Sequence, residues 1–211
     1  MRTDDLIAAL AADTQRPGRS PALSQAVAIV AGGLLSFGLL LVTLGTREDL
    51  VPALFTWRFD LKLALVAAAL MLAIVDCLRL ASPVATGWAS RRSFLIFAFL
   101  AAAVAAELYA TGPETWSTRL VGTNALVCLS VMPALSLPPL ALALIAMRSA
   151  APSSPAAAGA AVGRLAAAVA ASLYALHCFD DSPLIVAVWY PLATLPVILL
   201  GSFAGQRLLR W

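Results

Sequence analysis

The apolar positions of this chain gather into six long runs that short polar stretches separate. Each run is close to the ~20 residues that a helix needs to cross ~30 Å of hydrocarbon. A transmembrane β-barrel would instead show segments of about ten residues with alternating polarity. Since a lipid-buried backbone must satisfy its own hydrogen bonds, the runs predict helices. We therefore expect an all-α polytopic membrane helical bundle with six transmembrane helices, at about residues 24–44, 61–80, 94–110, 124–147, 156–176 and 184–205.

Little of the chain remains outside the transmembrane domain 24–205. The longest other stretch is the N-terminal tail, residues 1–23, and the chain ends in the short segment 206–211. The tail does not resemble a secretory signal, because acids stand at positions 4 and 5 and no small-residue cleavage site follows the first run. We expect no folded kinase, hydrolase or sensor domain on either side of the membrane.

Composition agrees with the membrane assignment. Of the 211 residues, 62% are hydrophobic and 12% are charged, whereas about 25% is the usual charged fraction of a soluble domain. The mean hydropathy is +0.92. So few charges cannot cover a water-soluble surface, and a soluble enzyme, a nucleic-acid binder or a disordered regulator is not expected.

The distribution of Lys and Arg predicts the orientation. With a cytoplasmic N-terminus, nine positive residues flank the runs on the inside and four on the outside. Because positive residues favour the cytoplasmic side, we expect an N-in, C-in topology. The positives are scattered singly, so no direct nucleic-acid partner is expected. The first outer loop is the exception, because it holds Arg47, Arg58 and Lys62.

The tail begins with a short amphipathic pattern. A threonine can cap the helix, and two aspartates fall in its first turn, where the helix dipole favours negative charge. Three apolar residues then form a stripe. A helix of about eleven residues is marginal in water, so it would form against a protein partner or on the membrane surface. The candidate partner-binding residues are Thr3, Asp4, Asp5, Leu6, Ile7 and Leu10.

Small residues predict close helix packing. Gly159 and Gly163 are four apart in the fifth run, as are Gly201 and Gly205 in the sixth. This spacing lets helix backbones approach closely in lipid. Packing within the bundle is favoured over a dimer interface.

Prolines predict an irregular fourth helix. Pro133, Pro138 and Pro139 lie within this run. Each lacks a backbone donor, so carbonyls one turn earlier lose their partners. We expect a kinked or interrupted helix, either for packing or as an element that transmits a signal.

The predicted topology separates the three cysteines. Cys77 lies near the inner end of the second run, whereas Cys128 and Cys178 lie at the outer ends of the fourth and fifth. The short loop between these two runs suggests that they pack together, so the two thiols can meet on the periplasmic side. Two thiols in an oxidising compartment can form a disulfide or bind a soft or borderline metal ion.

Polar residues extend this candidate site. His177, with Cys128 and Cys178, completes a candidate metal-ligand set, and Asp180 and Asp181 are possible supporting groups. There is no C-x-x-C pair and no second histidine. Three interpretations therefore stay open: structural thiols, a disulfide or redox sensor, and a metal site. No resident cofactor follows from the sequence.

Two acids lie inside the apolar runs, Asp76 and Glu107. Carboxylates at membrane depth are costly and usually have a partner or a role. The spacing of Asp76 and Arg79 predicts a local ion pair. Glu107 lies near the outer end of its run, and we count it among the possible supporting groups of the thiols.

Catalytic motifs are missing from the sequence. There is no P-loop, no glycine-rich nucleotide fingerprint and no histidine pair for a zinc hydrolase. We therefore expect a non-enzyme without a small-molecule substrate. The alternative is a membrane thiol oxidoreductase or a small metal transporter. The first would favour a C-x-x-C pair, and the second would favour polar residues along a path through the midplane.

Several segments together carry a family resemblance. They are the six runs, the opening 3–10, the segment 128–139, the block Tyr174–Pro183 and the pair Trp189-Tyr190. On these the whole chain resembles the NrsF-type anti-sigma factors of proteobacteria. The Thr-Asp-Asp-Leu opening and the His-Cys-x-Asp-Asp-Ser-Pro block are the most specific parts. Where the family pattern has a proline after the second cysteine, this chain has Phe179.

The resemblance implies a function. It implies a multi-pass protein of the bacterial inner membrane that holds an extracytoplasmic-function (ECF) sigma factor inactive. It also implies that the cytoplasmic tail binds the sigma factor, and that Cys128 and Cys178 are needed for the response to metal or oxidative stress. It implies no role for Cys77.

Overall fold

The computed structural model describes residues 3, 7, 20–81, 92–150 and 152–209. These residues form helices and connecting segments, with no strand among them, so the predicted all-α class is confirmed. The elements are α2 (Pro21–Thr43), α3 (Leu50–Ala53), α4 (Trp57–Leu80), α5 (Arg92–Ala110), the 3-10 turn η1 (Pro113–Thr115), α6 (Trp116–Val121), α7 (Ala125–Met147), α8 (Pro155–Ala175) and α9 (Pro183–Leu208).

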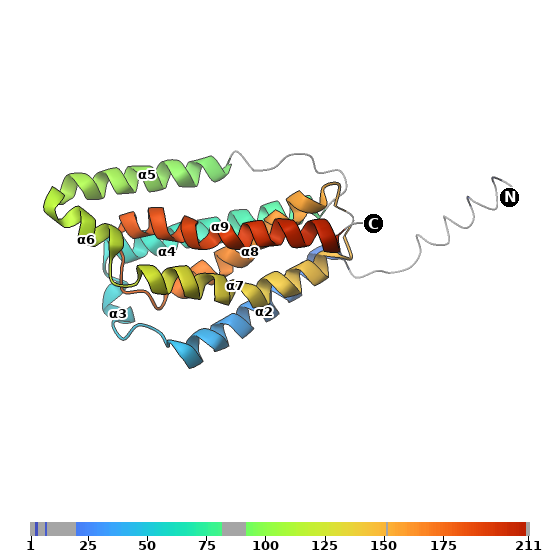
Figure 1. Cartoon of the computed structure of the whole chain (residues 1–211), viewed down its shortest axis with the longest axis horizontal. Helices are drawn as coiled ribbons and strands as arrows, with labels where there is room; N and C mark the ends of the chain where they lie inside the picture. Colours follow the sequence, from blue (N-terminus) through green and yellow to red (C-terminus); the bar gives the residue numbers. More distant parts are fainter. Residues whose placement is uncertain (1–2, 4–6, 8–19, 82–91, 151, 210–211) are drawn as a thin grey trace.

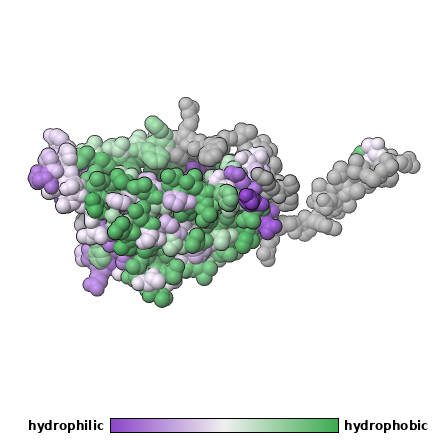
Figure 2. Space-filling model, viewed as in Figure 1, coloured by the Kyte–Doolittle hydropathy of each residue, from purple (hydrophilic) through white to green (hydrophobic). Residues whose placement is uncertain are grey.

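The long helices lie side by side along one axis, with α3 and α6 at one end of the bundle (Figure 1). Five described helical segments are long and apolar enough to cross a membrane: Pro21–Thr43, Trp57–Leu80, Pro113–Met147, Pro155–Ala175 and Pro183–Leu208. The predicted run 94–110 lies in α5, whose apolar part Ile96–Ala110 is shorter. The sixth span and the N-in, C-in orientation therefore stay predictions. On the face that Figure 2 shows, apolar residues cover most of the bundle, and hydrophilic residues gather towards its ends.

Three of the long helices, α2, α8 and α9, begin with a Ser-Pro pair. The hydroxyl of Ser20, Ser154 or Ser182 accepts a hydrogen bond from a backbone N–H in the first turn. This bond satisfies one of the four free N–H groups of a helix start. The proline then occupies the first helical position, where its fixed φ suits a helix and its missing N–H group is not needed.

α8 is the central helix of the bundle. In its most apolar stretch 78% of the residues are buried, against 17% in α2. It packs against α4, α7 and α9. Its sequence is mostly alanine with two glycines, and small side chains let several neighbouring backbones approach at once.

The four spaced glycines interlock α8 with α9. A Cβ on Gly159 would lie 2.2 Å from the carbonyl oxygen of Gly201, and a Cβ on Gly201 would lie 2.5 Å from that of Gly159. Gly163 and Gly205 lie in the same contact. These distances are far shorter than a van der Waals contact, so only glycine fits. The predicted use of these glycines for packing within the bundle is confirmed.

We expect Gly201→Ala to lower the free energy of unfolding by about 1–3 kcal/mol, because the methyl group would push two backbones apart. The matched control is Gly38→Ala, since nothing lies within 4 Å of a Cβ at Gly38. Alanine has the higher helix propensity, so the control should be neutral or stabilise by up to about 1 kcal/mol. Thermal unfolding in detergent measures both variants. Equal effects of the two substitutions would contradict the interlock.

α7 passes through its three prolines as one helix from Ala125 to Met147, so the helix is not interrupted, and the kink stays a prediction. The carbonyl of Leu135, which loses its helical donor at Pro139, accepts a hydrogen bond from the Ser36 hydroxyl at 2.7 Å. Gly32 makes room for this contact, because a Cβ there would lie 2.4 Å from the Cα of Pro139. The freed carbonyl is therefore satisfied by α2.

Candidate functional site

Cys128 and Cys178 belong to one cluster of packed, buried side chains. Cys128 lies in the first turn of α7, and Cys178 lies in the α8–α9 loop, residues 176–182. Each is 1% exposed, and neither is in a disulfide. Tyr174 and Tyr190 belong to the same cluster. We call Cys128 and Cys178 together the thiol site.

Each of the two thiols donates one hydrogen bond to a nearby acceptor. The Cys128 thiol donates to the sulfur of Met132 at 3.2 Å, and the Cys178 thiol donates to the backbone carbonyl of Asp180 at 3.7 Å. Burial raises the pKa of the Cys178 thiol, and the nearby Lys62 ammonium partly opposes this shift. The Cys178 sulfur is therefore held as a neutral thiol at neutral pH, the less reactive form.

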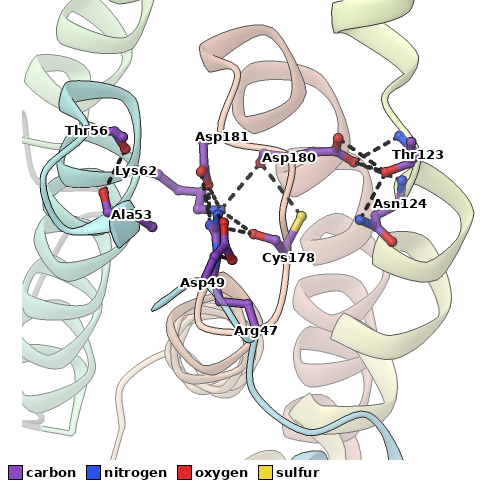
Figure 3. Close-up of polar contacts among 10 residues, drawn as sticks. All are labelled: Arg47, Asp49, Ala53, Thr56, Lys62, Thr123, Asn124, Cys178, Asp180 and Asp181. Atoms are coloured by element: carbon purple, nitrogen blue, oxygen red, sulfur yellow. Dashed lines mark hydrogen bonds and ion pairs between the residues drawn. The ribbon is translucent and has the colours of Figure 1, made fainter. Parts of the chain in front are cut away.

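Asp180 joins the α8–α9 loop to the start of α7. Its carboxylate accepts hydrogen bonds from the backbone N–H groups of Thr123 at 3.0 Å and Asn124 at 2.9 Å (Figure 3). Gly122 makes this contact possible, since its φ is +58° and a Cβ there would lie 2.7 Å from the Asp180 carboxylate. A carboxylate at a helix N-terminus is favourably placed. The two cysteine-bearing segments are thus held together by a residue two positions after Cys178.

Asp181 joins the same loop to α4 and to the segment before α3. Its carboxylate forms ion pairs with the Lys62 ammonium and with the Arg47 guanidinium, the latter at 2.9 Å (Figure 3). The exposed fractions of Lys62 and Arg47 are 1% and 6%. Both cations also donate to the carbonyl of Cys178, at 2.8 Å from Lys62 and 3.3 Å from Arg47.

Arg47 is held by a second carboxylate and by aromatic rings. Asp49 accepts from its guanidinium at 2.7 Å. Phe59 and Phe179 lie under the guanidinium, with ring centroids 5.0 and 5.2 Å away. The carboxylate of Asp49 raises the pKa of Arg47; burial of Arg47 opposes this shift, and Asp181 adds to it. Arg47 in turn lowers the pKa of Asp49. Both groups therefore stay charged over the physiological range.

Arg47 and Lys62 were not predicted from the sequence as site residues. A signal was present, because the predicted topology puts both on the outer side of the membrane, where positive residues are disfavoured. A positive residue at such a place often has a specific carboxylate partner, and here that partner is Asp181.

A polar cleft of 410 Å³ opens beside the α8–α9 loop. Arg58 and Arg119 line it together with Asp180 and Asp181. The cleft gives small ions and molecules an approach to the loop that carries Cys178.

The predicted metal ligands are not gathered around one point. His177 makes a 3.0 Å hydrogen bond through Nδ1 with the carbonyl oxygen of Gly45. Among the described residues, no three His, Cys, Asp or Glu side chains are placed to hold a metal ion. A site built from Cys128, His177 and Cys178 would therefore require movement of the loop.

The two acids inside the apolar runs have partners from other parts of the chain. Glu107 is fully buried and pairs with Arg58 at 3.1 Å and Arg119 at 2.8 Å. Asp76 pairs with Arg164 of α8 at 2.7 Å, so the predicted Asp76–Arg79 pair is wrong. Arg164 comes from a helix that the sequence does not place beside α4, and the pairing follows from the packing of α4 on α8.

The tail is only partly described. Thr3 and Ile7 are helical and exposed, whereas Asp4, Asp5, Leu6 and Leu10 lie outside the described residues. The start of α2, from which the tail continues, lies at the end of the bundle away from α3 and α6 (Figure 1). The thiol site lies towards the opposite end.

Fold and site together define an all-helical membrane protein with a buried thiol site near one end, held by a charged cluster. A family model described as "Negative regulator of sigma F" (NrsF) matches residues 10–211. The chain belongs to this NrsF family, as the sequence resemblance predicted, and the family is regulatory rather than catalytic.

Two relatives match along their full lengths. The chain is 39% identical over 218 residues to "Anti-sigma-F factor NrsF" of Caulobacter vibrioides (strain NA1000 / CB15N), which covers 100% of both chains. It is 34% identical over 213 residues to "Probable anti-sigma-F factor NrsF" of Azospira oryzae (strain ATCC BAA-33 / DSM 13638 / PS), again over 100% of both chains. No solved structure matches the chain.

Proposed function

We propose that this protein is an anti-sigma factor of the bacterial inner membrane. In the resting state the N-terminal tail holds an ECF sigma factor inactive on the cytoplasmic side. When Cys128 and Cys178 are oxidised or bind a soft metal ion on the periplasmic side, the sigma factor is released. The observation that carries this proposal is the placement of both cysteines in one buried cluster, towards the end of the bundle opposite the start of α2.

The contacts of the α8–α9 loop support a route from thiols to tail. A disulfide would join the two sulfur atoms, passing two electrons to the oxidant and two protons to solvent. A soft metal ion would draw two thiolates together. Either event moves the loop relative to α7, and Asp180 and Asp181 couple that movement to the start of α7 and to α4. α7 in turn packs against α2, which leads into the tail.

The test is the transcriptional response of cysteine variants. Cys128→Ser and Cys178→Ser should each abolish the induction of a sigma-dependent reporter by an oxidant or a thiophilic metal, because neither reaction can then join two thiols. Cys77→Ser is the matched control. Cys77 is buried in a different cluster, so this variant should respond normally. Normal induction in both of the first two variants would refute thiol sensing.

A further inference from the structure

An apolar cavity of 360 Å³ lies between α4, α5, α8 and α9. α5 runs along one side of the bundle (Figure 1), where it packs against α4 and α9. The lining residues of α9 extend from Val186 to Ile198, which is about 18 Å of helix. Arg164 is the one charged side chain among the described residues that line the cavity. We call this cavity the α5 slot.

Arg164 is an unusual residue for the third turn of a membrane-spanning helix. Its guanidinium pairs with Asp76 through Nη2 at 2.7 Å, but its Nε is buried and has no hydrogen-bond partner among the described residues. The side chain is 31% exposed, against 5% for Asp76. A charge at membrane depth is costly unless it is paired. The free N–H groups of Arg164 therefore call for a further acceptor, which a hydrocarbon chain alone does not supply.

The ion pair places this guanidinium near one end of the bundle. Asp76 lies one turn before Leu80, the last residue of α4, and a long arginine side chain can extend towards the start of its own helix. Arg79 stands three positions after Asp76 on the same face of α4, and its side chain is exposed. Asp76, Arg79 and Arg164 together carry one net positive charge at this end of the α5 slot.

We propose that the α5 slot binds one acyl chain of an anionic phospholipid, whose phosphate is held by Arg164 and Arg79. The length of the slot suits this ligand, because one acyl chain covers one leaflet, about half of the ~30 Å hydrocarbon core. The forked N–H groups of a guanidinium match the geometry of a phosphate. A neutral apolar molecule would leave the cations without a partner. The proposal depends neither on sigma-factor binding nor on thiol sensing.

The far end of the α5 slot adjoins the thiol site. Five residues line the slot and also belong to the buried cluster that contains both cysteines, namely Leu65, Val66, Ala171, Val186 and Tyr190. A bound acyl chain would thus contact side chains that pack around the thiol site. Because a ligand that binds only the folded state stabilises it, the lipid should also raise the unfolding temperature of the bundle.

The test is the binding of defined lipids to the full-length protein, purified and exchanged into fresh detergent. The probes are dioleoylphosphatidylglycerol, which is anionic, and dioleoylphosphatidylcholine, which has the same acyl chains and no net charge. Native mass spectrometry counts the bound lipids during a titration. We expect one saturable site that prefers dioleoylphosphatidylglycerol about tenfold, because hydrogen bonds to a charged group contribute at least that much.

Two variants separate the head group from the chain. Asp76→Asn combined with Arg164→Gln removes both charges without leaving a buried carboxylate unpaired, and it should lose most of the tenfold preference. Ala69→Phe puts a ring into the slot and should weaken the binding of both lipids about tenfold. The matched controls are Arg148→Gln, just after α7, and Ala68→Phe on α4. Both positions are exposed and neither lines the slot, so both controls should bind like the parent.

Thermal unfolding in the same detergent without lipid verifies that each variant is folded. Equal affinity of the parent for the two lipids would overturn the proposal, as would parent-like binding by Ala69→Phe. Tighter binding of decylubiquinone, a neutral quinone with an apolar tail, would assign the slot to another ligand and also overturn it. None of these results bears on the proposed function, which the reporter response of the cysteine variants tests separately.

Discussion

A chain that lacks residues 2–14 is expected to stay in the membrane and to hold no sigma factor, so that sigma-dependent transcription is fully on without stress. The deleted residues carry the acidic start and the apolar stripe of Leu6, Ile7 and Leu10. A short amphipathic helix binds a partner through such a stripe. The helices α2 to α9 are untouched, and their packing should survive. Membrane fractionation, with a reporter assay in the same cells, measures both results.

The control for this deletion keeps the length and charge of the tail. A variant with the same residues 2–14 in scrambled order preserves composition but loses the stripe, and it should also fail to hold the sigma factor. If the scrambled tail still retains the sigma factor, charge rather than the apolar stripe drives binding. If the deleted chain still retains it, the tail is not the binding element.

The second large effect is expected at Asp181. Asp181→Ala should lower the free energy of unfolding by about 3–5 kcal/mol, because it leaves the buried Lys62 without a carboxylate and removes one of two from Arg47. For a chain of this size such a change lowers the unfolding temperature by roughly 10 °C. Thermal unfolding of the purified protein in detergent gives the measurement.

Asp49→Ala is the matched control for Asp181→Ala. It also removes a carboxylate from Arg47, but the Asp49 side chain is 48% exposed and has no ion pair with Lys62. Arg47 and Lys62 both keep Asp181 in this variant, so it should lose less stability than Asp181→Ala and unfold closer to the parent temperature. Similar losses at the two positions would show that Asp181 is not the buried counter-ion of the cluster.

The positions of the helices could be predicted from the sequence alone. Apolar runs of span length give the long helices, and Ser-Pro pairs mark three of their starts. The spacing of Gly159 and Gly201 with their partners also predicted a close helix contact, which the structure places between α8 and α9. These features are local, since a single segment carries both the pattern and its consequence.

The partners of buried charges could not be predicted in the same way. Asp76 pairs with Arg164, 88 positions away, rather than with Arg79, and Lys62 pairs with Asp181, 119 positions away. Such pairs depend on which helices lie side by side, and apolar runs of similar length do not reveal that order. The uninterrupted course of α7 could not be predicted for a related reason, because the hydroxyl that satisfies the carbonyl of Leu135 comes from Ser36 of α2.

In the candidate site, some features could be predicted from the sequence and others could not. Topology alone suggested that Cys128 and Cys178 could meet, and they lie in one cluster. The roles of Asp180 and Asp181 as ties to α7 and α4 needed the structure, because their partners lie far along the chain. A metal site with His177 was a prediction from sequence proximity, and the ring of His177 contacts Gly45 instead.

The most direct test of the account is the amount of sigma factor that co-purifies with the membrane protein before and after stress. With the parent chain we predict that an oxidant or a thiophilic metal removes most of the bound sigma factor. With the Cys128→Ser, Cys178→Ser double variant the sigma factor should stay bound under the same treatment. Equal loss from both proteins would contradict the claim that these two thiols control release.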